Sequence, residues 1–259
     1  MKVESFKDLP LHFQNQFKEI AKTGEKCLNE AAKFGDVIII TNSDDGWVKF
    51  SAERFVPSIL PCLEKFPIVS ARTRYERFYP NQPLCWKAAA FAHEVNEVFM
   101  SNGKDDKNGG DESMSTDVSS EDESEDNSPP PSKEHSKKVG SDNIALLREV
   151  ISFGDSMEER TAVKIVASQL EATPKSVMFI SSPSPTHLIG QLTMLTSRME
   201  FVCMHDNALD LEISPQQAQK AAETYLQKVK TKVNANTSGG ALSSVTNIHE
   251  KAHRIPSNF

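Results

Sequence analysis

Four β-branched apolar residues follow one another from Val37 to Ile40. Because this run contains no polar residue, it predicts a strand that is covered on both faces, as strands are in parallel sheets. Parallel strands need crossover connections between them, which are usually helices. The sequence meets this requirement, since helical patterns alternate with short apolar runs. We therefore expect an α/β protein with a Rossmann-like parallel sheet flanked by helices.

The predicted helices and strands alternate in both halves of the chain. Helical periodicity covers residues 11–34, 47–55, 59–63, 83–99, 157–170, 187–199 and 215–233. Strand patterns cover residues 37–41, 68–71, 148–153, 176–180 and 209–213, the last with the alternation of an edge strand. Residues 72–82 form an aromatic and basic segment that is predicted to be a loop.

The segment from residue 101 to residue 141 differs in composition from the rest of the chain. It is rich in Asp, Glu, Ser, Gly and Pro and has almost no large apolar residue. Such a segment cannot bury enough surface to offset the entropy lost on ordering. We expect a disordered acidic insertion here, between an N-terminal part (1–100) and a C-terminal part (142–233) of one domain. Residues 234–259 are predicted to form a disordered tail.

Ser119 and Ser120 lie in this acidic insertion, and each has an acidic residue three positions later. The spacing is typical of sites for acidophilic kinases, and phosphorylation would increase the negative charge of the segment. Serines with this spacing also occur by chance in acidic linkers, and both interpretations stay open. An acidophilic kinase is therefore one candidate partner.

Charge and cysteine content restrict the classes of function. The formal net charge of −7 argues against a general surface for nucleic acid or anionic membranes. We expect the arginines of residues 72–82 to pair with nearby acids, and nucleic acid ranks last among the partners. The cysteines are scattered, no signal peptide precedes them, and no apolar run is long enough to span a bilayer. A cytoplasmic protein with reduced thiols is expected, and a nuclear location stays open.

The segment from Val150 to Glu159 is predicted to be a strand that ends in Gly154-Asp155 and turns into a helix. Ligands of open α/β folds bind at the carboxyl ends of the strands, where Asp155 is expected. Glu159 follows four positions later, and a helical offset of four would bring both carboxylates to one face. Such a pair suits a hard cation such as Mg²⁺. A strand end followed by an ordinary helix cap is the alternative explanation.

Two further groups are expected at the same edge of the sheet. Thr41 and Asn42 end the first strand and offer a hydroxyl and an amide to an anion. Lys87 begins the helix after the aromatic segment and has a positive charge suited to phosphate. A hydroxyl, a lysine and a pair of acids are what a phosphoryl-transfer site needs around the transferring group. The ordinary alternatives are a helix cap for Thr41-Asn42 and a solvated helix residue for Lys87.

In this order, the motifs resemble those of the haloacid dehalogenase-like (HAD) superfamily. Three segments match its second, third and fourth motifs, namely Ile38-Ile39-Ile40-Thr41-Asn42, Lys87 and Gly154-Asp155-Ser156-x-x-Glu159. With their neighbours, these segments look like an uncharacterised group of HAD-like proteins found in protists. The resemblance covers about residues 30–100 and 143–213. It implies phosphate binding by Thr41, Asn42 and Lys87, and Mg²⁺ binding by Asp155 and Glu159.

The first motif of the HAD superfamily is missing. HAD enzymes open with a strand that ends in Asp-x-Asp-x-Thr, where the first Asp is the nucleophile and the second is the acid/base. No such motif precedes the predicted helix at 11–34, and Ser43-Asp44-Asp45-Gly46 would put a serine in the nucleophile's position. In the family this strand lies centrally, between the strands expected at 37–41 and 148–153. Without the nucleophile, no aspartyl-phosphate intermediate forms.

We therefore expect an incomplete or catalytically inactive relative of Mg²⁺-dependent phosphatases. Such a protein would retain divalent-cation or phosphate binding, and its partner would be a phosphorylated small molecule or protein. The alternative is a non-catalytic protein-interaction module that is regulated by phosphorylation of the acidic insertion. A membrane is not an expected partner.

Overall fold

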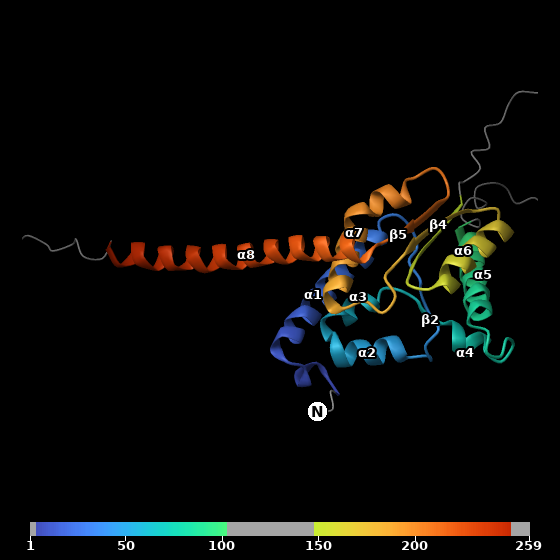
Figure 1. Cartoon of the computed structure of the whole chain (residues 1–259), viewed down its shortest axis with the longest axis horizontal. Coiled ribbons are helices and arrows are strands. Elements are labelled where there is room, and N and C mark those ends of the chain that lie inside the picture. The colour runs from blue at the N-terminus through green and yellow to red at the C-terminus, as the bar shows by residue number, and fades with distance from the viewer. Residues whose placement is uncertain (1–3, 103–147, 250–259) are drawn as a thin grey trace, which may run out of the picture.

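The computed structural model describes residues 4–102 and 148–249. Helices flank parallel sheets in this part of the chain, so the predicted α/β class is confirmed. Figure 1 shows a compact part that contains the sheets, and one long helix, α8, that extends away from it. Apart from residues 101 and 102, the predicted acidic insertion lies outside the described residues, and so do Ser119 and Ser120.

The helices and strands alternate along the chain. The α-helices are α1 (Leu11–Ala31), α2 (Trp47–Phe55), α3 (Leu60–Leu63), α4 (Ala71–Tyr75), α5 (Pro83–Asn102), α6 (Met157–Gln169), α7 (Pro185–Cys203) and α8 (Pro215–His249). The strands are β1 (Ile39–Thr41), β2 (Ile68–Ser70), β3 (Glu149–Gly154), β4 (Thr173–Met178) and β5 (Leu209–Glu212). The 3₁₀ turns η1 (Phe6–Asp8) and η2 (Pro57–Ile59) precede α1 and α3.

The strands form two parallel sheets rather than one. β1 pairs with β2, and Ile40 lies opposite Val69. β4 lies between β3 and β5, with Ser152 of β3 opposite Ser176 of β4. Among the described residues, no backbone pairing joins β1 to β3. The single sheet that we predicted is therefore divided, with β1 in one sheet and β3 in the other.

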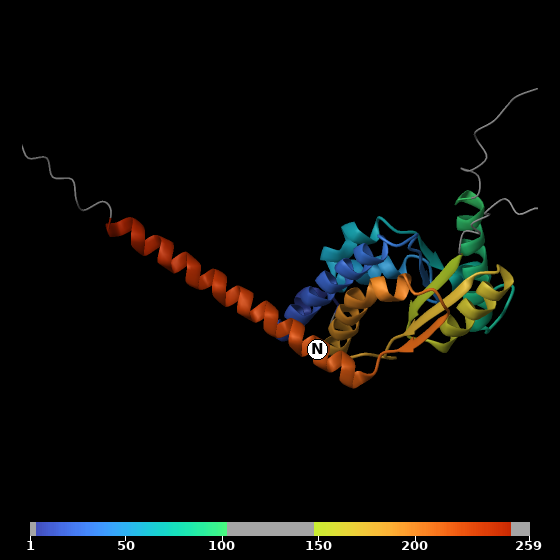
Figure 2. The ribbon, with the colours of Figure 1, turned by 90° about the horizontal axis from the view of Figure 1, so that it is seen from above.

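Helices pack on both sides of the strands. Figure 2 shows α5 and α6 together on one side, and α1 and α7 on the other. One apolar cluster joins β1 and β2 to α5, and its buried members are Val69, Ala71, Trp86 and Ala90. Two further clusters pack α7 against α1, α8 and the larger sheet, around Val177, Leu195, Met199 and Val202. In the described part of the chain, the first cluster shares no residue with the other two, so each sheet has its own core.

The backbones of α7 and α8 approach each other closely where the two helices cross. Gly190 of α7 faces the backbone of Ala218 in α8, and a Cβ atom on Gly190 would lie 1.9 Å from the carbonyl oxygen of Ala218. Only glycine therefore allows this crossing. From there α8 continues to His249, so our prediction that the helix ends at Val233 is wrong.

The predicted loop at residues 72–82 begins instead with a short helix, α4. Ser70, the last residue of β2, is the N-cap of this helix, because its Oγ accepts a hydrogen bond from the backbone N–H of Thr73 at 3.0 Å. A capped N–H group stabilises the first turn of a helix. The polar residue at the end of β2 thus turns the chain directly from strand to helix.

Candidate functional site

Lys87 connects the two sheets. Its side chain is buried near the start of α5, with 3% of the residue exposed. Its Nζ donates one hydrogen bond to the carbonyl oxygen of Ile40 in β1, at 2.6 Å, and another to Oε1 of Glu159 in α6, at 2.7 Å. Glu159 lies in the first turn of the helix that follows β3. One buried ammonium group therefore holds the carboxyl ends of β1 and β3 together.

Glu159 folds back over the end of β3. Its Oε2 accepts a hydrogen bond from the backbone N–H of Ser156 at 3.4 Å, and its own N–H donates to Oγ of Ser156 at 3.3 Å. This reciprocal arrangement is a capping box, which satisfies two free donors at a helix start. A Cβ atom on Gly154 would lie 1.6 Å from Oε2 of Glu159. A side chain at position 154 would therefore displace this carboxylate.

Asp155 and Glu159, the predicted carboxylate pair, differ in their surroundings. Asp155 is exposed, and no ion pair or hydrogen bond of its side chain is found in the described part of the chain. It precedes the N-cap Ser156, so it lies outside α6, and the helical offset of four does not apply to it. Glu159 is already bound to Lys87 and Ser156.

The described residues do not fit a preformed Mg²⁺ site. They contain no group of three or more His, Cys, Asp and Glu side chains that could hold a metal ion. The carboxylate of Glu159 forms an ion pair with Lys87. Of the two acids, this leaves the carboxylate of Asp155 open to a cation. Mg²⁺ demands near-octahedral oxygen ligands, which this arrangement does not supply.

Thr41 and Asn42 lie beside Ile40, at the end of β1 that Lys87 contacts. Oγ1 of Thr41 accepts a hydrogen bond from the N–H of Ser43 at 3.0 Å, so its hydroxyl hydrogen is available to another acceptor. Nδ2 of Asn42 donates to the carbonyl oxygen of Pro83 at 3.4 Å. Its Oδ1 is buried without a partner among the described residues. Leaving such an atom unpaired costs about 1–3 kcal/mol, so this position favours a ligand that brings a donor.

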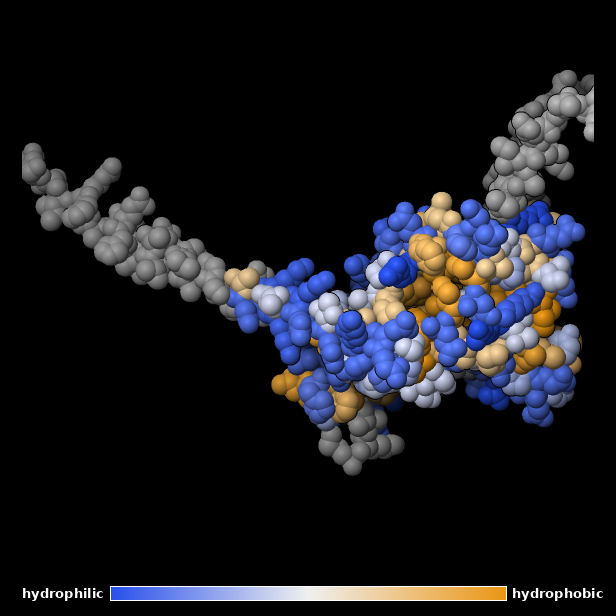
Figure 3. Space-filling view, turned by 45° about the horizontal axis from the view of Figure 1, so that its top comes forward, coloured by the Kyte–Doolittle hydropathy of each residue, from blue (hydrophilic) through white to orange (hydrophobic). Residues whose placement is uncertain are grey.

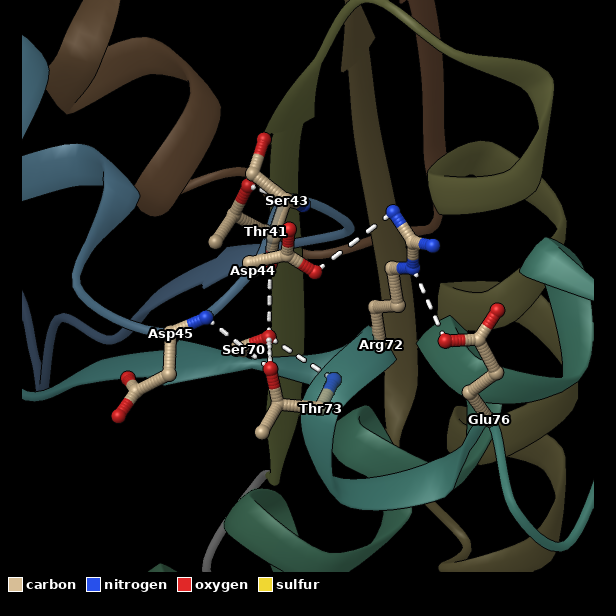
Figure 4. Close-up of polar contacts among 8 residues, drawn as sticks. All are labelled: Thr41, Ser43, Asp44, Asp45, Ser70, Arg72, Thr73 and Glu76. Carbon is tan, nitrogen blue, oxygen red and sulfur yellow. Dashed lines mark hydrogen bonds and ion pairs between the residues drawn. The ribbon is translucent and has the colours of Figure 1, made fainter.

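A polar cluster that the sequence did not predict fixes the loop after β1. Figure 4 shows Ser70 and Thr73 at its centre, with Ser43 and Asp45 above and beside them. Oγ of Ser70 donates to the carbonyl oxygen of Ser43 at 2.7 Å, and the N–H of Asp45 donates to Oγ1 of Thr73 at 3.0 Å. The signal was present in the sequence, because a serine at a strand end three residues before Thr73 is a typical helix cap.

Two of the three arginines of this region pair with acids, as we predicted, whereas Arg77 lies over the ring of Phe78. Nε of Arg72 lies 3.0 Å from the carboxylate of Glu76, and its Nη1 lies 3.6 Å from that of Asp44, contacts that Figure 4 also shows. Arg74 is bound to Glu94. The charges of Arg72 and Arg74 are therefore balanced within the protein.

The pKa of Tyr225 in α8 is strongly shifted. Burial raises the pKa of its phenol to about 12, and the hydrogen bond to Glu19 acts in the same direction. On β5, the hydrogen bond from Arg160 lowers the pKa of Asp210. Both groups form contacts between elements of the fold, which explains their shifts without a role in chemistry.

Comparison of the chain with protein-family models, with curated proteins and with solved structures found no match in any of the three. In the ranges that the structure describes, no helix combines the length and the apolar character needed to cross a bilayer. HAD membership and a function at the Lys87 edge are therefore proposals, argued from the residues themselves.

Proposed function

We propose that this chain is an incomplete or catalytically inactive HAD-like relative of Mg²⁺-dependent phosphatases that binds a phosphate group at the carboxyl ends of β1 and β3. The observation that carries the proposal is the buried Lys87, whose ammonium group already holds an anion, the carboxylate of Glu159. Buried lysine and phosphate form a strong charge-assisted hydrogen bond. An anion of similar charge can therefore take the place of Glu159.

Glu159 is suited to act as an exchangeable internal ligand. Its side chain is 15% exposed, and its carboxylate is the far end of a flexible side chain, so an incoming anion can displace it from Lys87. A phosphate oxygen would then accept the hydrogen bond from Lys87. The free hydroxyl hydrogen of Thr41 and the amide of Asn42 supply further donors at the same strand end.

Catalysis is not part of this proposal. An aspartyl-phosphate needs a carboxylate nucleophile on a first-motif strand, and this sequence contains no Asp-x-Asp-x-Thr segment before α1. A two-carboxylate Mg²⁺ site would also require Lys87 to release Glu159. Phosphate binding without turnover is the function that requires the smallest change in the arrangement described above.

Titration calorimetry with inorganic phosphate tests the proposal. We expect Glu159→Gln to bind phosphate about tenfold more tightly than the wild type, because the competing anion is gone. Thr41→Val is expected to bind more weakly, and Lys87→Met to lose binding. Lys164→Met is the matched control, since this exposed lysine pairs with Asp210 of β5, which β4 separates from β3. Its affinity should equal that of the wild type.

Two results would overturn the proposed function. One is a phosphate affinity that is the same in the wild type and in the variants Glu159→Gln and Thr41→Val. Both variants keep Lys87, so this result would stand even if Lys87→Met failed to fold. The other is Mg²⁺-dependent hydrolysis of p-nitrophenyl phosphate that falls in an Asp155→Ala variant, which would show an active enzyme.

A further inference from the structure

An open groove of about 630 Å³ lies where α8 meets α1 and α7. Its apolar lining includes Met194 of α7 and Val229 of α8, which are partly buried. The charged residues that line it are all lysines, and no acidic residue of the described ranges takes part. The lysines come from two helices and are Lys26 of α1 and Lys220, Lys228 and Lys232 of α8. We call this feature the α8 groove.

The lysines of α8 stand in a row beside the groove. Lys220, Lys228 and Lys232 are separated by multiples of four residues, which places them along one ridge of the helix. At the rise of an α-helix, the row is about 18 Å long. Like charges four residues apart destabilise a helix, as Lys228 and Lys232 do here. An anion bound along the row would therefore reduce a repulsion that is built into α8.

The four lysines of the α8 groove have no acidic partner within the ranges that the structure describes. All four are exposed, and none of their ammonium groups takes part in an ion pair there. Other lysines of α1 differ, because Lys22 pairs with Glu19 and Lys33 pairs with Glu30. Figure 3 shows mostly hydrophilic side chains on the stretch of α8 that adjoins the compact part. The groove thus combines an apolar lining with a positive charge that is not balanced locally.

The sequence of the same chain contains a complementary anion. Residues 111–126, which lie outside the described ranges, include eight acidic residues and no basic one. Five of these acids fall within the six residues from Glu121 to Asp126, which span at most about 20 Å. This length matches the row of lysines on α8. We propose that the acidic segment 111–126 binds the α8 groove of its own chain through ion pairs with the four lysines.

The segment is long enough to reach the groove. Nineteen residues separate Glu121 from Asn102 and twenty-two separate Asp126 from Arg148, so each connection spans up to about 60 Å. A compact domain of about 200 residues has a radius of gyration of about 16 Å, so every face of it lies within this reach. Tethering also raises the effective concentration of the segment to the millimolar range. Exposed ion pairs that are weak one by one therefore suffice to hold it.

The position of two serines gives this contact a means of control. Ser119 and Ser120 lie within the acidic segment, directly before Glu121. Phosphorylation would add a charge of about −1.5 to −2 at each serine, so the segment would bind the lysines more tightly. This inference concerns the α8 groove and does not depend on phosphate binding at Lys87.

Carbodiimide cross-linking of the full chain, followed by mass spectrometry, tests the inference. The reagent joins a lysine amine directly to a carboxylate, so it reports ion pairs. We expect Lys220 and Lys228 to be linked to residues 121–126 at least about fivefold more often than Lys49, an exposed lysine of α2 outside the groove. The links should decrease in about 1 M salt, which screens exposed charges. In a mixture of ¹⁴N and ¹⁵N chains, linked peptides should carry a single isotope.

NMR spectra of the ¹⁵N-labelled full chain give a second measurement that needs no lysine chemistry. In a neutral variant, the five acids from position 121 to position 126 are replaced by their amides. We expect the amide signals of Ala221 and Val229 to move in this variant, whereas that of Val48 on α2 should not. A synthetic 111–126 peptide added to the neutral variant should move the two signals back. The same peptide phosphorylated on both serines should bind about tenfold more tightly.

Three results would overturn the inference. The first is equal linking of Lys49 and the groove lysines, which would show that the acidic segment contacts lysines without preference. The second is linking between chains of different isotope, which would make a second copy the source of the acidic segment. The third is a neutral variant whose Ala221 and Val229 signals match those of the wild type, which would leave the groove to another anion.

Discussion

Lys87 and Lys175 are bound in the same way in two different regions of the molecule. Lys175, which is fully buried in β4, donates to the carbonyl oxygen of Cys203 at 2.9 Å and pairs with Glu149 of β3 at 2.7 Å. Lys87 also holds one carbonyl oxygen and one glutamate. However, β3 and β4 share a backbone ladder, whereas β1 and β3 share none within the described residues. The contact of Lys175 thus adds to an existing backbone ladder between β3 and β4. The contact of Lys87 is the main polar connection between β1 and β3 in the described residues.

The largest effect is expected from Lys87→Met. The substitution leaves Glu159 without its partner while its side chain is only 15% exposed, which costs about 3–5 kcal/mol for a buried ion pair. Urea denaturation measures the change in the free energy of unfolding. The double variant Lys87→Met/Glu159→Gln should recover part of the loss, because no buried charge remains. If the free energy of unfolding of Lys87→Met fell by less than about 1 kcal/mol, the Lys87 contact would not be the main polar connection between β1 and β3.

Gly154→Ala is expected to have the second largest effect. A Cβ atom here would lie 1.6 Å from Oε2 of Glu159, so the carboxylate must move away from Lys87. We expect a loss of about 1–3 kcal/mol, the range for overfilling a packed position. Gly35→Ala is the matched control, since its Cβ would have no neighbour within 4 Å. Equal effects of the two alanines would show that Glu159 is not held over β3.

Lys175→Met should cost less than Lys87→Met, about 1–2 kcal/mol from the lost hydrogen bonds of a charged donor. The carboxylate of Glu149 is 26% exposed, so water can solvate it after its partner is removed. The backbone ladder of β3 and β4 also remains. Denaturation under the conditions used for Lys87→Met gives the comparison directly. A larger loss for Lys175 would reverse the order of the two regions.

Tyr225 extends the comparison of the two lysines to a neutral hydrogen-bond donor. At neutral pH, we expect its substitution to change the free energy of unfolding least. Its hydroxyl donates to the carboxylate of Glu19 at 2.8 Å, between α8 and α1. The pKa of the folded state, about 12, lies above the ordinary value of 10.0, so the folded state binds the proton more tightly. This stabilisation is fully present below pH 10 and is lost as the pH rises toward 12.

Thermal unfolding of Tyr225→Phe measured from pH 8 to pH 12 checks this expectation. Phenylalanine does not titrate, so the variant should lose less stability than the wild type above pH 10, although it lacks the hydrogen bond at neutral pH. Parallel pH curves for the two proteins would contradict the assigned shift.

Local patterns in the sequence predicted most of the elements, because periodicity reports which face of an element is covered. The predicted helix at 47–55 matches α2, and the alternating segment at 209–213 is the edge strand β5. β4 begins at Thr173, three residues earlier than predicted, and includes Pro174. Proline is tolerated there because pairing with β5 begins only at Lys175, so the missing N–H costs no ladder bond.

The candidate site was predicted only in part. Thr41, Lys87 and Glu159 come to the same edge, as parallel strands require. The sequence could not show that Lys87 and Glu159 bind each other, because that depends on the direction of two long side chains after packing. Asp155 also lies outside α6, so a helical offset of four does not describe its position relative to Glu159. A one-residue difference in the start of a helix changes which side chains share a face.

The crossing of α7 and α8 at Gly190 has a mechanical consequence for the rest of α8. With the backbone of Ala218 in contact, α8 can neither slide nor rotate on α7 without a collision. The 35 residues of α8 span about 50 Å at the rise of an α-helix, so a small rotation at its base would become a large displacement at its far end. The glycine therefore sets the direction of a lever arm, and any partner bound along α8 would be held in one orientation relative to the sheets.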